Sequence, residues 1–167
     1  VLALGAGIGE TGLLQTALTL PFLLFAIPAG LMADRLQRRQ LMVGAEVLRA
    51  LSLFALLNLI LLDRLTWPLL AFLGFVAVCG TVAFSVAAPS LVPALVLPEA
   101  LPTANARIEL ARTTAFAAGP ALGGLLVGWT GAATAFAFAA ILSALAALLL
   151  SGVQEPVRAA TSARRHP

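Results

Sequence analysis

The stretch TLPFLLFAIPAGLMADRLQRR, residues 19–39, decides the fold class. Its first part, residues 20–33, carries no charge, and Asp34 with three arginines follows directly. Because lipid offers no hydrogen bonds to a bare backbone, a long apolar run crosses a bilayer as an α-helix. Arginines directly after such a run hold that end of the helix at the membrane surface. The stretch therefore predicts the end of a transmembrane helix followed by a basic loop.

The composition extends this reading to the whole chain. Of its 167 residues, 61% are hydrophobic and 10% are charged, against roughly 25% charged in ordinary soluble domains. The mean hydropathy is +1.05. The apolar runs are continuous over about 20 residues and rich in Ala and Leu, whereas strands of a membrane barrel alternate over about 10 residues. We therefore expect an all-α membrane protein.

The apolar runs predict a bundle of five complete transmembrane helices, residues 1–152, and a polar cytoplasmic linker or tail, residues 153–167. The apolar start, Val1–Gly9, is typical of the end of an earlier helix or a loop. One further helix before it would complete a six-helix bundle with both ends in the cytoplasm. The five predicted spans are residues 12–32, 41–62, 68–88, 108–127 and 132–152.

Arginine placement predicts the orientation, because cytoplasmic loops carry the excess of basic residues. The opposite side has only Arg64, and Trp67 and Trp129 lie at that boundary, where an indole ring suits the headgroup level. We therefore expect the arginine-rich side, the connection from Ala88 to Arg107 and the tail to be cytoplasmic. The arginines on that side are Arg35, Arg38, Arg39, Arg107, Arg158, Arg164 and Arg165.

Several classes of function find little support in the residues. The ten basic residues are all arginine and mostly end apolar runs, which does not resemble a nucleic-acid-binding face. Cys79 lies alone in an apolar run, and His166 in the tail has no partner at metal-ligand spacing. No nucleophile or phosphate loop lies in a suitable context. We expect no enzyme activity, no metal, no cofactor and no nucleic-acid partner.

The loop after the first span carries the first motif. Gly30 allows another helix to approach, and three arginines fix the loop at the surface. A simple stop-transfer signal explains the arginines but not the acid. Asp34 among Arg35, Arg38 and Arg39 instead favours a salt-bridge cluster that can form and break.

The fourth span carries the second motif, Ala118–Gly124. Pro120 removes one backbone hydrogen bond and bends the helix. Gly119, Gly123 and Gly124 clear one face for close packing. Simple helix packing remains an alternative to a specific function.

Together these residues resemble the major facilitator superfamily. Residues 30–39 resemble the family's loop motif G-x-L-A-D-R-x-G-R-R/K, with Met32 and Gln37 replacing Leu and Gly. In the family this loop is a gate that contacts the other half of the transporter. The string GPxxGG at residues 119–124 is similar to a fifth-helix motif of the antiporter branches, although Ala115 stands where a further glycine is common.

The resemblance covers nearly the whole chain and points to the bacterial siderophore and macrolide exporters, the transmembrane secretion effector subgroup. It implies the amino-terminal half of a secondary transporter in the bacterial plasma (inner) membrane. The implied partners are the lipid bilayer, a small amphipathic substrate, protons and a carboxy-terminal transporter half.

Two charge pairs inside the spans are candidate ion-pair or proton sites. Glu46 and Arg49 are three residues apart, and Glu109 and Arg112 repeat that spacing, with Asn105 one turn earlier. Local ion pairing explains both pairs. The alternative is that Glu46 or Glu109 exchanges a proton during transport.

Two functions from different classes stay open. The first is proton-coupled efflux by alternating access. The second is a truncated or non-transporting membrane module that needs a partner half, because five spans alone lack the opposing wall of a cavity.

Overall fold

The computed structural model describes residues 7–35 and 37–153, and of residues 8 and 32–35 it describes the backbone alone. Within these residues there are five long α-helices, one 3₁₀ turn and no strand. All five helices are long and apolar enough to cross a membrane, which confirms the predicted fold class. The elements are α1 (Ile8–Arg35), α2 (Arg38–Leu61), α3 (Trp67–Leu95), η2 (Pro98–Ala100), α4 (Leu101–Thr130) and α5 (Ala132–Ser151).

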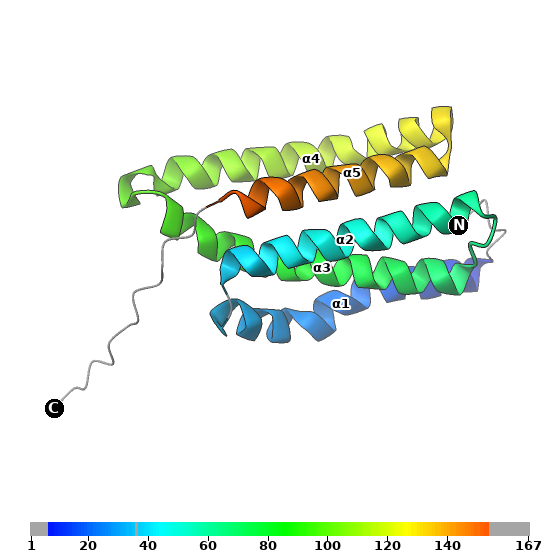
Figure 1. Ribbon diagram of the computed structural model, residues 1–167, viewed down its shortest axis with the longest axis horizontal. Helices are drawn as coiled ribbons and strands as arrows, with labels where there is room; N and C mark the ends of the chain where they lie inside the picture. The colour runs from blue at the N-terminus through cyan, green and yellow to red at the C-terminus, as the bar shows by residue number, and fades with distance from the viewer. Residues whose placement is uncertain (1–6, 36, 154–167) are drawn as a thin grey trace.

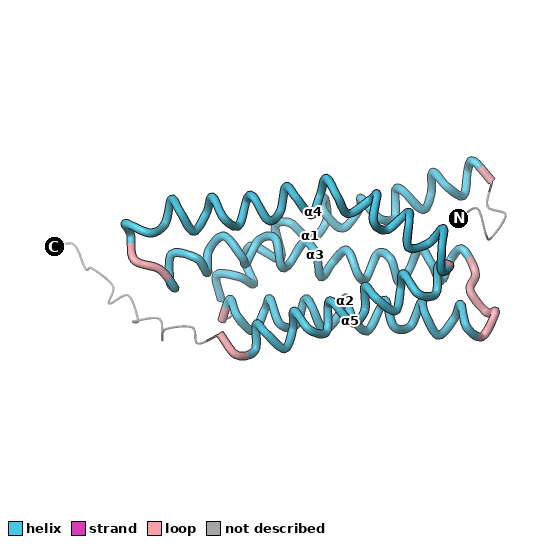
Figure 2. The backbone as a smooth tube through the Cα atoms, turned by 90° about the horizontal axis from the view of Figure 1, so that it is seen from above, coloured by secondary structure: helices cyan, strands magenta, loops and turns pink. Residues whose placement is uncertain are grey.

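The helices run side by side along the long axis of the molecule (Figures 1 and 2). Their contacts order them as α1, α3, α2, α5 and α4 across the bundle. The α2–α3 and α4–α5 connections lie at one end, and the α1–α2 and α3–α4 connections lie at the other (Figure 1). Trp67 and Trp129 therefore lie at the end opposite Arg38 and Arg39.

The helices extend beyond the apolar runs, most clearly around the third connection. The predicted connection from Ala88 to Arg107 is largely helical, because α3 continues through Pro89 and Pro93 and α4 begins at Leu101. Only Val96–Ala100 separates the two helices. Prolines start helices well, since the first turn needs no N–H donor, and both η2 and α4 have one in their first two positions. Polar residues can also continue a helix past the hydrocarbon, where hydropathy gives no signal.

The centre of the bundle is α2, which packs against both α3 and α5. Gly80 of α3 makes this packing possible. A Cβ atom at Gly80 would lie 2.6 Å from the backbone oxygen of Ala45, far inside van der Waals contact. Next to this close approach, a buried cluster joins α2 and α3 through Leu41, Met42, Ala87 and Leu91.

On the other side of α3, α1 packs equally closely. A Cβ at Gly74 would lie 2.8 Å from Cδ2 of Leu18, and the rings of Phe25 and Phe75 meet edge to face with centroids 6.2 Å apart. Pro21 is fully buried within α1. Close contacts of small and aromatic side chains hold helices together in lipid, where apolar burial alone gives little gain.

The α4–α5 hairpin turns on a single residue, Gly131. Its φ of 88° lies in the left-handed region that favours glycine, and its N–H bonds the carbonyl of Val127 to close the last turn of α4. The hairpin packs α4 mainly on α5, and no residue of α4 is buried.

The Gly80 contact gives a stability prediction. Gly80→Ala should lower the stability of the folded bundle by about 1–3 kcal/mol, because the added methyl group forces α2 and α3 apart. Thermal unfolding of the purified protein in detergent measures this. Gly44→Ala on α2 is the matched control, since no described atom lies within 4 Å of its added Cβ. A Gly80→Ala protein as stable as the Gly44→Ala protein would contradict the prediction.

Candidate functional site

The best-defined polar site is the Glu46–Arg49 pair on α2. Arg49 Nη2 donates to both carboxylate oxygens of Glu46, at 2.7 Å to Oε1 and 2.6 Å to Oε2. The Glu46 side chain is 3% exposed and that of Arg49 is 31% exposed. Glu46 lies eight residues after Arg38, about 12 Å along the helix. The pair therefore lies inside the bundle, further along α2 than the arginines that begin this helix.

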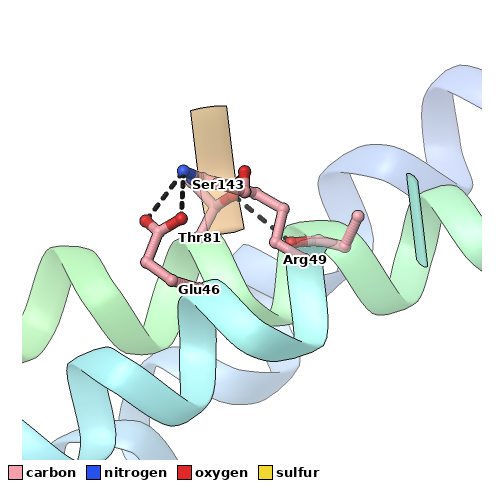
Figure 3. A network of polar contacts seen from close by, with 5 residues as sticks. Glu46, Arg49, Thr81 and Ser143 are labelled. Atoms are coloured by element: carbon pink, nitrogen blue, oxygen red, sulfur yellow. Dashed lines mark hydrogen bonds and ion pairs between the residues drawn. The ribbon is translucent and has the colours of Figure 1, made fainter. Parts of the chain in front are cut away.

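Arg49 also reaches another helix. Its Nε donates to Oγ of Ser143 on α5 at 3.0 Å, and Ser143 is 3% exposed. Figure 3 shows Arg49 between Glu46 of its own helix and Ser143 of α5, with Thr81 of α3 in the same view. One guanidinium group thus joins a buried acid to a neighbouring helix through two of its nitrogens.

The tight α2–α3 contact supports this site on the side of α2 away from α5. Gly80 lies against the backbone of Ala45, the residue directly before Glu46. Because a larger residue at position 80 would push α2 away, the close approach fixes the turn of α2 that carries the acid.

The second predicted pair has a very different environment. Arg112 Nη1 lies 3.8 Å from Glu109 Oε2, with side chains 78% and 67% exposed, and Asn105 is exposed as well. An exposed pair with this separation contributes little to stability. The two pairs share their spacing in sequence but only Glu46–Arg49 is buried, since α2 lies between two helices and α4 packs mainly on one.

The residues of the predicted gating loop fall into two groups. The side chains of Asp34 and Arg35 lie outside the described part of the structure. Arg38 and Arg39 begin α2 and are half-buried, and Arg39 Nη2 donates to the backbone carbonyl of Ser151. A cation at the last carbonyl groups of α5 is favoured by both hydrogen bonding and the helix dipole.

The glycines of the two motifs have no close neighbours among the described residues. No described atom lies within 4 Å of an added Cβ at Gly30, Gly119, Gly123 or Gly124. The close packing expected at these glycines is therefore absent among the described residues, and Gly74 and Gly80 make the tight contacts instead. Neither glycine stands out in the sequence, because glycines recur throughout the apolar runs.

Pro120 lies within α4, which continues unbroken through it to Thr130. Around the second motif, α4 and α5 form an open groove of about 750 Å³. Its walls are apolar except for Thr114 and one basic residue, Arg107. Small and large side chains line it together: Ala111, Ala115, Ala118, Gly119, Gly123, Ala135 and Ala139, with Leu110, Leu122, Leu126, Phe138 and Leu142.

Ser143 was also missed in the sequence. Serine is common in membrane helices, where its hydroxyl usually bonds a carbonyl of its own helix. Nothing in the run around Ser143 indicates that it faces Arg49, 94 residues earlier. Among the described residues, no group of three His, Cys, Asp or Glu side chains could hold a metal ion.

Comparison with known proteins addresses the whole chain. A family model described as transmembrane secretion effector matches residues 3–163. No curated protein and no solved structure matches the chain. The family match covers both motifs and all five helices, and it confirms the resemblance to major facilitator transporters. The chain belongs to the transmembrane secretion effector family of major facilitator transporters.

Proposed function

We propose that the chain forms the amino-terminal half of a secondary active transporter that exports a small amphipathic molecule in exchange for protons. Alternating access is the mechanism expected of two helical halves that rock about a central site. The observation that carries the proton coupling is the buried Glu46–Arg49 pair. The arginine-rich connections support placing the tail on the cytoplasmic side of a bacterial plasma membrane.

Burial makes Glu46 the stronger proton candidate. A charged group inside a membrane is expensive, and such groups commonly mark ion or proton pathways. Arg49 offsets the cost while Glu46 is ionised, and protonation of Glu46 removes that attraction. Glu109 is 67% exposed and lies 3.8 Å from Arg112, so a proton there would change little in the packing of this bundle.

The groove between α4 and α5 supports a larger assembly. It extends along α4 from Arg107 to Leu126, about 28 Å along the helix, which is enough to cross the hydrocarbon of a bilayer. Its small residues would allow a further helix to approach closely. We therefore assign this face to another helix of the same transporter, from the predicted sixth helix of this half or from the carboxy-terminal half.

A non-transporting membrane module is the second candidate. The observation that favours it is α4, of which no residue is buried within this chain. Such a module would bind a partner half without carrying substrate. Export of a test solute in liposomes that contain this chain together with its carboxy-terminal half separates the two functions, because a binding module gives none.

The gating loop gives the first transport prediction. Asp34→Asn should insert normally and lower efflux about tenfold or more, because an acid that bonds cationic partners supplies about 1.5–3 kcal/mol. Efflux of ethidium, an amphipathic dye, from proteoliposomes with a pH gradient measures the effect. Asp63→Asn is the control, since Asp63 is an exposed acid in the opposite connection and Asn tolerates its positive φ. Unchanged efflux in Asp34→Asn would rule out the gate.

The two acids give a second comparison. Glu46→Gln should abolish the acceleration of ethidium efflux by a pH gradient, because the amide cannot exchange a proton. Glu109→Gln should keep that acceleration. The measurement compares efflux with and without the gradient for each variant. If Glu46→Gln still responds to the gradient, Glu46 is not the proton carrier.

The groove between α4 and α5 gives a third transport prediction. Gly119→Leu should lower efflux about tenfold or more by blocking the approach of another helix. Gly128→Leu, on the same helix but outside the groove lining, should leave efflux near the parent value. Equal efflux in the two variants would show that nothing docks closely at Gly119.

A further inference from the structure

We propose that Glu46, Arg49 and Ser143 form a proton-controlled clasp between α2 and α5, in which Ser143 is a positioning residue for Arg49. Here the clasp means the two contacts of one guanidinium group, to the carboxylate of Glu46 and to the hydroxyl of Ser143. The inference deepens the proposed function and rests on it for the role of Glu46 in transport.

Ser143 differs from other serines of the bundle in what it bonds. Hydroxyl groups in membrane helices usually donate to a carbonyl three or four residues earlier. Ser52, Ser85 and Ser90 do so, to Leu48, Val82 and Ala87. Ser143 instead accepts a hydrogen bond from Arg49 of another helix. Its hydroxyl therefore serves the contact between helices.

The guanidinium geometry makes the two contacts interdependent. The donors of arginine form a rigid planar fork, so the direction of Nε fixes the direction of Nη2. When Ser143 holds Nε, Nη2 lies 2.6–2.7 Å from both oxygens of Glu46. When the contact to Ser143 or to Glu46 is lost, the guanidinium group is free to rotate away from the remaining partner.

No other described acid faces this clasp. The helices packed on α2 are chiefly α3 and α5. The sequence of α5 contains no ionisable side chain, and that of α3 contains only Cys79, which lines a separate pocket with Phe25 of α1. α1 barely touches α2 and has Glu10 at its distant end. The remaining charges near α2 are Arg38 and Arg39 at its start, the exposed Asp63 and Arg64 after its far end, and Asp34 and Arg35, whose side chains lie outside the described part.

Protonation of Glu46 changes the net charge at the interface between α2 and α5. The proton binds one carboxylate oxygen, and the net charge of the clasp rises from zero to one because arginine keeps its proton. A buried cation without a counter-charge is strongly disfavoured. Arg49 is 31% exposed, so its long side chain can turn toward the bundle surface and leave Ser143. Protonation thus opens the clasp, while the Arg39 contact to the Ser151 carbonyl does not depend on Glu46.

Thermal unfolding of the full chain in detergent, from about pH 3 to about pH 8, a range that spans the ordinary titration of a carboxyl group, tests the clasp. The variants are Ser143→Ala, Glu46→Gln, their combination, and Ser52→Ala as the matched control of equal burial. Ser143→Ala should lower Tm by about 3–6 °C at high pH, where the clasp is closed, and by much less at low pH. In the Glu46→Gln background, Ser143→Ala should have little effect at either pH. Ser52→Ala should change Tm equally at all pH values.

A loss of Tm in Ser143→Ala that is the same at every pH, or the same with and without Glu46→Gln, would overturn the proposal. Should Glu46→Gln fail to fold, the pH dependence of Ser143→Ala alone decides. Ethidium efflux separates the clasp from the proposed function. If the Tm results are as expected but Glu46→Gln efflux still responds to a pH gradient, the clasp exists and proton coupling through Glu46 is wrong.

Discussion

A peptide group in hydrocarbon has no water to bond, and this constraint shapes every level of the bundle. It turns each long apolar run into a helix whose backbone bonds are internal. It also directs hydroxyl groups to carbonyls of their own helix, as for Ser52 and Thr81. No described buried side-chain nitrogen or oxygen lacks a partner. Polar contacts between helices are therefore exceptional, and in α2 they come from two arginines, Arg39 and Arg49.

The position of α2 explains why its charged pair differs from that of α4. Backbone contact at Gly80 brings α3 against one side of α2, and α5 covers the side that carries Glu46 and Arg49. Removal of these charges from water is compensated by their short bonds to each other. On α4 the same spacing places Glu109 on an open helix face. Helix packing, and not the local motif, separates a buried ion pair from an exposed one.

Much of this could be predicted from the sequence. Hydropathy and arginine placement indicated an all-α membrane fold, and the loop at Asp34 with the motif at Pro120 indicated the family. The helix faces could not be predicted, because helices that are apolar all round carry no amphipathic pattern to show which residues meet. For that reason Gly80 and Ser143 were missed and Glu46 could not be ranked above Glu109. The length of α3 was underestimated because the helix continues through Pro89 and Pro93 to Leu95.

The glycines of α4 lower the stability of their helix, and no described residue packs closely against them in exchange. Each glycine weakens a helix by roughly 1 kcal/mol relative to alanine. Gly119 and Gly123 line the groove, yet no described atom contacts the space above their Cα atoms. Lipid chains solvate an exposed Phe or Leu side chain well. A surface of small residues gains van der Waals contact only when another backbone comes close. If α4 meets a further helix, as the proposed function requires, contact with that helix would offset the intrinsic cost of its glycines.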